Sequence, residues 1–124
     1  MTYSDRATAS RMEAACDLLS KAERRYLLYH LADNHQATLD DLLTQIVAWK
    51  RGEAVDTVDG DTRRQLYVSL VHNHLPRLAD YDIIEYDLRS GDIVLSEGFE
   101  DIKPLLEQFK QTEEIPELRK QPTL

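Results

Sequence analysis

Apolar residues recur at helical spacing from Asp61 to Asp80 and at strand spacing from there to Ser96. At about 100° per residue, one face of this helix collects apolar side chains and one histidine: Leu66, Leu70, Val71, His74 and Leu78. The opposite face is polar or small, with Arg64, Gln65, Val68, Ser69 and His72. Pro76 lacks an amide hydrogen and crowds the carbonyl four residues back, so we expect it to bend or interrupt the last turn. The pattern predicts a long helix with a core face and an outer face.

A β-hairpin is predicted directly after this helix. The residues on both sides of the sequence DLRSGD are strand formers, namely Ile83, Ile84 and Tyr86 before it and Ile93, Val94 and Leu95 after it. Serine and glycine suit the turn between them. Because so short a hairpin is marginally stable alone, we expect it to pack on the helices.

Two helices are expected near the N-terminus. The first spans Arg6–Leu19, with one apolar side formed by Ala7, Ala14, Ala15, Leu18 and Leu19. The sequence S-K-A-E then has the form of a capping box, in which the Ser20 hydroxyl accepts from the Glu23 amide while Glu23 reaches back. The second helix, about Lys21–Asn34, has an apolar stripe of Leu27, Leu28, Leu31 and Ala32 that leaves out Arg24, Arg25 and Tyr29.

A third helix is predicted from Thr38, whose hydroxyl can cap it. Its apolar residues follow the i, i+3, i+4, i+7, i+8 pattern and are Leu39, Leu42, Leu43, Ile46 and Val47. Trp49 lies near its end, and Gly52 is a suitable stop. The connector RGEAVDTVDG is polar, acidic and longer than the turn of the simplest helix-turn-helix.

A last helix near the C-terminus carries Phe99, Ile102, Leu106 and Phe109 at helical spacing, and Pro104 would best occupy its first turn. Together with Leu18, this stripe either forms a homodimer contact or packs onto its own domain. We favour the homodimer, because two-fold symmetry is the commonest form of oligomer and suits the reading of paired DNA half-sites. The tail from Thr112 is expected to fray.

Length and composition indicate one globular domain with extensions, since the 124 residues are 42% hydrophobic and 31% charged. We expect a mostly helical α+β fold, with residues 1–19 as a helical extension, 20–96 as the domain and 97–124 as a helix and tail. We see no apolar run long enough for a membrane span and no signal region, which favours the cytoplasm and no membrane partner. A single Cys16 excludes an internal disulfide and a cysteine-based zinc cluster.

Three segments resemble those of a family of small winged-helix domains abundant in haloarchaea: LLSKAERRYLLYHL, ATLDDLLTQIVAWKRG and RRQLYVSLVHNHLPRLADYDIIEYD. The resemblance extends from about Asp17 to Leu95 and is most specific in the last segment. It implies a winged helix-turn-helix with a two-stranded wing, here with extra N- and C-terminal helices, that binds DNA and regulates transcription. This chain has Asp82 where the family usually has glycine, so the turn into the wing is expected to differ.

Within a winged helix, the outer face of the long helix would enter the major groove of double-stranded DNA. Arg64 would bond guanine and Gln65 adenine, while Val68, Ser69 and His72 would allow close approach or read base edges. Phosphates would be held by Arg63 and by Arg89 with Ser90 at the hairpin tip. Thr38 would contact a phosphate or serve only as a cap, and Lys21, Arg24 and Arg25 would pair with Glu23 and nearby acids or contact phosphates.

The net charge of −8 and pI near 4.9 argue against nucleic acid, because phosphate contacts require Lys and Arg. Either the protein is a protein-interaction module, or its acidity serves solubility at high salt, as in proteins of salt-loving archaea, with a small basic patch for DNA. No catalytic constellation is visible, so an enzyme is not expected. No cofactor is expected either, and a metal site is not, because His72 and His74 are two residues apart and face different directions on a helix.

Overall fold

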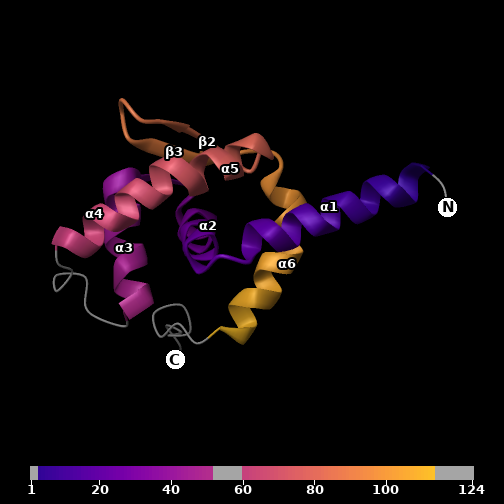
Figure 1. Ribbon diagram of the computed structural model, residues 1–124, viewed down its shortest axis with the longest axis horizontal. Helices are drawn as coiled ribbons and strands as arrows, with labels where there is room; N and C mark the ends of the chain where they lie inside the picture. The colour runs from indigo at the N-terminus through magenta and orange to yellow at the C-terminus, as the bar shows by residue number, and fades with distance from the viewer. Residues whose placement is uncertain (1–2, 52–59, 114–124) are drawn as a thin grey trace.

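The computed structural model describes residues 3–51 and 60–113. Its elements follow in the order α1 (Tyr3–Leu19), α2 (Ala22–Asn34), β1 (Gln36–Thr38), α3 (Leu39–Arg51), α4 (Gly60–Ser69), η2 (Leu70–His74), α5 (Leu75–Asp80), β2 (Ile84–Asp87), β3 (Asp92–Leu95) and α6 (Phe99–Thr112) (Figure 1). The expected mostly helical α+β fold is confirmed. The suggested stop at Gly52 and the tail beyond Glu113 lie outside the described residues.

The sheet has three antiparallel strands in the order β1-β3-β2, one more than the hairpin that the sequence predicts. Gln36 of β1 is opposite Val94 of β3, and Ile84 of β2 is opposite Leu95. The third strand could not be recognised because it has three residues, of which Ala37 alone is buried. It directly follows His35, whose positive φ of 66° ends α2, and it directly precedes α3.

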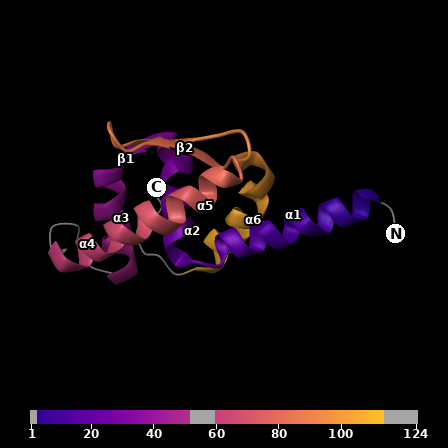
Figure 2. The same ribbon diagram turned by 45° about the horizontal axis from the view of Figure 1, so that its top comes forward.

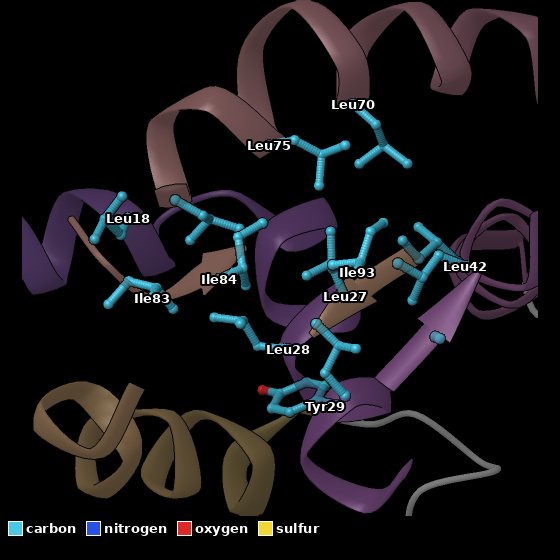
Figure 3. Packing of buried hydrophobic residues seen from close by; sticks show 14 of the residues in the cluster. Leu18, Leu27, Leu28, Tyr29, Leu42, Leu70, Leu75, Ile83, Ile84 and Ile93 are labelled. Carbon is cyan, nitrogen blue, oxygen red and sulfur yellow. The ribbon is translucent and has the colours of Figure 1, made fainter. Parts of the chain in front are cut away.

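Helix α2 lies at the centre of the molecule and packs against α1, α3, α6, β1 and β3 (Figures 1 and 2). All five apolar positions predicted for α3 are buried, as are the hairpin residues Ile84 and Ile93. Figure 3 shows Leu70 and Leu75 of the long helix pointing toward Leu27 of α2 and Ile93 of β3. The elements therefore share one apolar core, which removes the surface of these side chains from water.

The predicted long helix spans Gly60–Asp80 but changes register in its middle. Segment η2 is a π-helix, in which the Leu75 amide donates to the Leu70 carbonyl five residues back. Pro76 follows directly, so the wider turn lies where the proline ring would otherwise crowd the carbonyl of His72. A π turn delays the later residues by about one position, or roughly 100° around the axis. This delay turns Leu75, which the α-helical pattern places off the core face, fully into the core.

The two predicted helix caps have different outcomes. The Thr38 hydroxyl accepts from the Asp41 amide at 3.1 Å, which confirms the cap of α3. The capping box at Ser20 is wrong, because the Ser20 hydroxyl donates to the Asp17 carbonyl at 2.7 Å and α2 has no side-chain cap at Lys21. Ser20 thus ends α1 and does not begin α2, since it satisfies a carbonyl left open at a helix C-terminus.

The stripe assigned to a homodimer contact packs within its own chain. Leu18, Phe99, Ile102 and Leu106 are 1–5% exposed in the core, and Phe109 packs partly buried against it. The assignment of these residues to dimerisation is therefore wrong, because their apolar surface is already covered. Pro104 is also not in the first turn of α6 but within the helix. A homodimer through other residues stays a prediction.

The turn before the hairpin keeps the backbone form that glycine favours. Asp82 has a φ of 61°, in the left-handed region. Aspartate tolerates this region better than most residues, and here its carboxylate accepts from the Ser96 hydroxyl at 2.8 Å. Its carbonyl also accepts from the Gly98 amide at 2.8 Å, which connects the turn to the start of α6. Asp82 thus adopts a left-handed conformation itself, and the expected difference from the family's turn stays a prediction.

Candidate nucleic-acid interface

The outer face of α4 and η2 is exposed over two helical turns. Arg64, Gln65 and His72 are exposed, Val68 is 49% exposed and Ser69 is half-buried. Tyr67 borders this face and is 44% exposed. Arg64 makes no hydrogen bond or ion pair with any residue that the structure describes. These six residues form what we call the α4 strip.

Arg63 was expected to hold a phosphate, but it is engaged inside the protein. Its guanidinium bonds the Asp40 carboxylate and the Thr44 hydroxyl, both on α3. It also donates to the Asp40 carbonyl at 3.3 Å. Arg63 thus connects α4 to α3, and the phosphate contact expected of it, which would compete with Asp40 for its charge, stays a prediction.

A shallow groove of about 460 Å³ separates the N-terminal ends of α3 and α4. Its walls are apolar at Leu39 and Leu43 and charged at Asp40, Arg63 and Arg64, and Tyr67 lies along it. The Leu39 amide donates to the Gly91 carbonyl of the hairpin turn at 2.6 Å. The start of α3 therefore lies between the α4 strip and the hairpin turn, and Thr38, which is exposed, is at this junction.

The hairpin turn exposes Arg89 and Ser90, but its surroundings are acidic. Asp87 and Asp92 are directly opposite each other at the end of the hairpin, a pairing of like charges that disfavours it. The Asp87 carboxylate accepts from the Arg89 amide at 2.9 Å, and the Ser90 hydroxyl accepts from the Asp92 amide at 3.2 Å. The two polar side chains of Asp87 and Ser90 thus shape the turn, and Arg89 lies in the turn that joins the two aspartates.

Two of the three basic residues proposed as accessory phosphate contacts, Arg24 and Arg25, are also occupied, while Lys21 is exposed. Arg24 and Tyr29, which the sequence pattern places outside the core, are buried at 3% and 1% exposure. Arg25 pairs with Glu113 of the α6 end at 2.7 Å, and its guanidinium lies 4.9 Å from the centre of the Phe109 ring. The Tyr29 hydroxyl donates to the same Glu113 carboxylate, and this bond and burial raise the tyrosine pKa. The cluster fixes α6 on α2.

A buried polar pair that the sequence did not reveal lies beneath the long helix. The Arg24 Nε–H donates to Nδ1 of His74 at 3.0 Å, and the guanidinium also donates to the Asp17 carbonyl at 3.0 Å. His74 is 3% exposed. Burial and the adjacent guanidinium lower the pKa of His74, so the neutral imidazole is the form that fits.

Other kinds of site receive no support within the described ranges. Across residues 3–51 and 60–113, no three His, Cys, Asp or Glu residues gather as a metal-binding group. Nor does any helix there have the length and apolar character to cross a membrane. Cys16 is exposed on α1.

Comparison with known proteins gives one match. No curated protein and no solved structure matches the chain. The model of a protein family, described as a domain of unknown function (DUF7344), matches residues 16–94. This range begins near the end of α1 and ends within β3, so it includes α2, the sheet and the long helix but not α6. Since the match covers more than half of the 124 residues, the chain belongs to the DUF7344 family.

Proposed function

We propose that this protein is a winged-helix regulator of transcription that reads double-stranded DNA with the α4 strip. The observation that carries the proposal is the strip itself: an arginine with no ion pair among residues 3–51 and 60–113, beside small and uncharged polar side chains on the exposed face of a well-packed helix. Arginine can bond guanine through two atoms, glutamine can do so with adenine, and a small apolar residue such as Val68 can touch a thymine methyl.

The order of the elements supports the winged-helix assignment. A helix, a short strand, two helices and a hairpin follow one another, and the short strand β1 pairs with the second hairpin strand β3. This arrangement is typical of winged helices, with α2, α3 and α4 as the three helices and the hairpin as the wing. The long helix would then be the one that docks in the major groove, with its N-terminal half nearest the bases.

The charge distribution limits the DNA contact to a small area. Along the α4 strip no acidic residue lies between Arg64 and His72. Around it, the acidic residues of α3, α4 and the hairpin outnumber the four arginines of the same elements, namely Asp40, Asp41, Asp61, Glu85, Asp87 and Asp92. We therefore propose that affinity depends on base contacts more than on phosphate contacts, and that the acidic surface elsewhere suits a protein that works at high salt.

The dependence of the DNA-binding constant on salt concentration gives a quantitative test of this proposal. Each phosphate neutralised adds about −0.9 to the slope of log K against log salt concentration. Arg89 is the exposed cation assigned to a phosphate, whereas Arg64 is assigned to a base, so we expect a slope of about −1 per protomer, and measurable binding at molar KCl. A steep slope with complete loss of binding at high salt would contradict the adaptation to salt.

The rival function is a protein-interaction module, and the acidic hairpin favours it. The deciding experiment is selection of bound duplexes from a random-sequence library, followed by titration of the enriched duplex and a shuffled control. We expect a defined motif, bound at least about a thousandfold more tightly than the shuffled duplex. Absence of enrichment, with equal and weak binding of both duplexes, would contradict DNA reading and favour the rival.

A further inference from the structure

The buried pair of Arg24 and His74 connects three helices at one point. Arg24 belongs to α2, and its guanidinium donates to the Asp17 carbonyl at the end of α1 and, at 3.5 Å, to the Leu18 carbonyl. Its Nε–H donates to His74, the last residue of η2. One buried cation therefore holds the end of α1 and the irregular turn of the long helix together.

The charged groups around this pair come from every helix that packs on it. Asp17 of α1 faces Arg24, but its carboxylate is bonded by Arg77 of α5 at 3.1 Å. Glu23 of α2 faces His74, but its carboxylate is bonded by Lys50 of α3, while Lys21 adds another positive charge. The two nearby carboxylates are thus both engaged by other cations, and a proton on His74 would meet Arg24 at hydrogen-bonding distance.

The position of the pair in the long helix gives it influence over the α4 strip. Segment η2 sets the rotation between α4 and α5, since its Leu75–Leu70 bond spans five residues. His74 closes this segment, and His72 of the α4 strip lies within it. A change at His74 therefore alters the segment that positions the end of the strip.

We propose that the Arg24–His74 contact is a pH-sensitive joint that holds the long helix in register, so that acidification releases η2 and weakens binding at the α4 strip. The second half of this proposal rests on the proposed DNA-binding function, whereas the first half does not. Arg24 and His74 act as positioning residues, because both are buried and neither can touch DNA.

The direction of the effect follows from which state takes up the proton. In the closed state His74 accepts a hydrogen bond from Arg24 and has a pKa below 6.5, whereas an opened η2 exposes an imidazole with an ordinary pKa near 6.5. Below that pH the opened state binds the proton and gains population, by at most about tenfold per pH unit. Above about pH 7.5 the joint stays closed and pH has no effect through this residue.

The test is amide hydrogen exchange of the full chain from pH 8 to 5, expressed as protection factors. For amides of Leu70–Asp80 we expect wild-type protection to fall below pH 6.5 by up to about tenfold per unit. In His74→Gln the amide oxygen can still accept from Arg24 and does not titrate, so protection should stay constant. His35→Asn, which removes an exposed histidine at a positive φ, should follow the wild type.

A second variant guards against a folding defect in the first. Arg24→Gln can still donate to His74 but removes the like charge, so the fall in protection should become smaller. A wild-type profile without a fall, or an equal fall in His74→Gln, would overturn the joint.

The connection to binding is measured as the affinity for the selected duplex at the same pH values. We expect wild type to lose affinity relative to His74→Gln below pH 6.5, a comparison in which every other titratable group is the same in the two proteins. If protection depends on pH while the affinity of wild type relative to His74→Gln does not, the coupling between the joint and DNA binding is wrong. If every variant fails to bind DNA while protection still depends on pH, the proposed function fails and the joint stands.

Discussion

The α4 strip and the hairpin turn each expose an arginine, but the charges around the two arginines differ. From Arg64 toward His72 the outer face of the helix is uncharged, with Asp61 and Asp40 near the N-terminal side of Arg64, whereas Arg89 lies in the turn between Asp87 and Asp92, which are opposite each other in the sheet. A carboxylate beside a cation weakens its attraction for phosphate and itself repels DNA. The comparison indicates that the helix carries the proposed DNA contact and that the hairpin adds little to it.

The largest change in the free energy of unfolding should come from a substitution on the inner face of the helix that carries the α4 strip. Leu75→Ala removes a fully buried side chain and should lower the free energy of unfolding by about 2–5 kcal/mol. Val68→Ala, on the outer face of the same helix, should change it by less than about 0.5 kcal/mol. Chemical denaturation measures both, and equal effects would contradict the rotation that η2 gives the helix.

The period of apolar residues predicts which residues are buried in a regular helix, but it fails in a helix with a π turn. In α3 the apolar period of a regular helix suffices, so the five residues predicted to be buried and the Thr38 cap are all confirmed. Leu75 is missed because the prediction assumes about 100° per residue, and a π turn breaks that period.

Partners that lie far apart in the chain cause the other errors. Arg24 is read as a surface residue because its partner His74 is 50 positions away, and Arg25 finds Glu113 at 88 positions. The stripe on α6 is read as a dimer contact because an amphipathic helix shows which face is buried but not what covers it. The candidate site was predictable where exposure alone matters, at Arg64, Gln65, Val68 and His72, and not at Arg63, whose partner Asp40 is on another helix.

On the strip itself, Arg64→Ala should weaken binding to the selected duplex by about 1–3 kcal/mol and relax preference at one base pair. Arg11→Ala, which removes an exposed arginine of α1, serves as the control and should leave both unchanged. Titration by fluorescence anisotropy measures the affinities. Similar losses for the two variants would mean that charge alone, without base reading, accounts for binding.

At the hairpin, Arg89→Ala should cost less, about 0.5–1 kcal/mol, because at most one phosphate bond is lost. The loss should be equal for selected and shuffled duplexes, and the salt slope should decrease in magnitude by about 1. The measurement is the titration above, repeated at four salt concentrations. A loss larger than that of Arg64→Ala would reverse the comparison between helix and hairpin.

The smallest effect is expected for Asp87→Asn. The amide oxygen keeps the bond from the Arg89 amide, while the repulsion with Asp92 disappears. We expect the protein to gain about 0.2–1 kcal/mol of stability, seen as a rise in the thermal unfolding midpoint. If the midpoint falls, the two carboxylates do not repel each other at this position and the account of the hairpin charge is wrong.

Val68 and Leu88 offer a matched pair for testing which region faces the bases, since both are apolar and both are 49% exposed. In a Cys16→Ser background, a single cysteine at either position is mixed with the selected duplex carrying a thiol tethered in its major groove. The account predicts a disulfide cross-link from position 68 and none from position 88. A cross-link from position 88 with none from position 68 would contradict the claim that the α4 strip, and not the hairpin, reads the DNA.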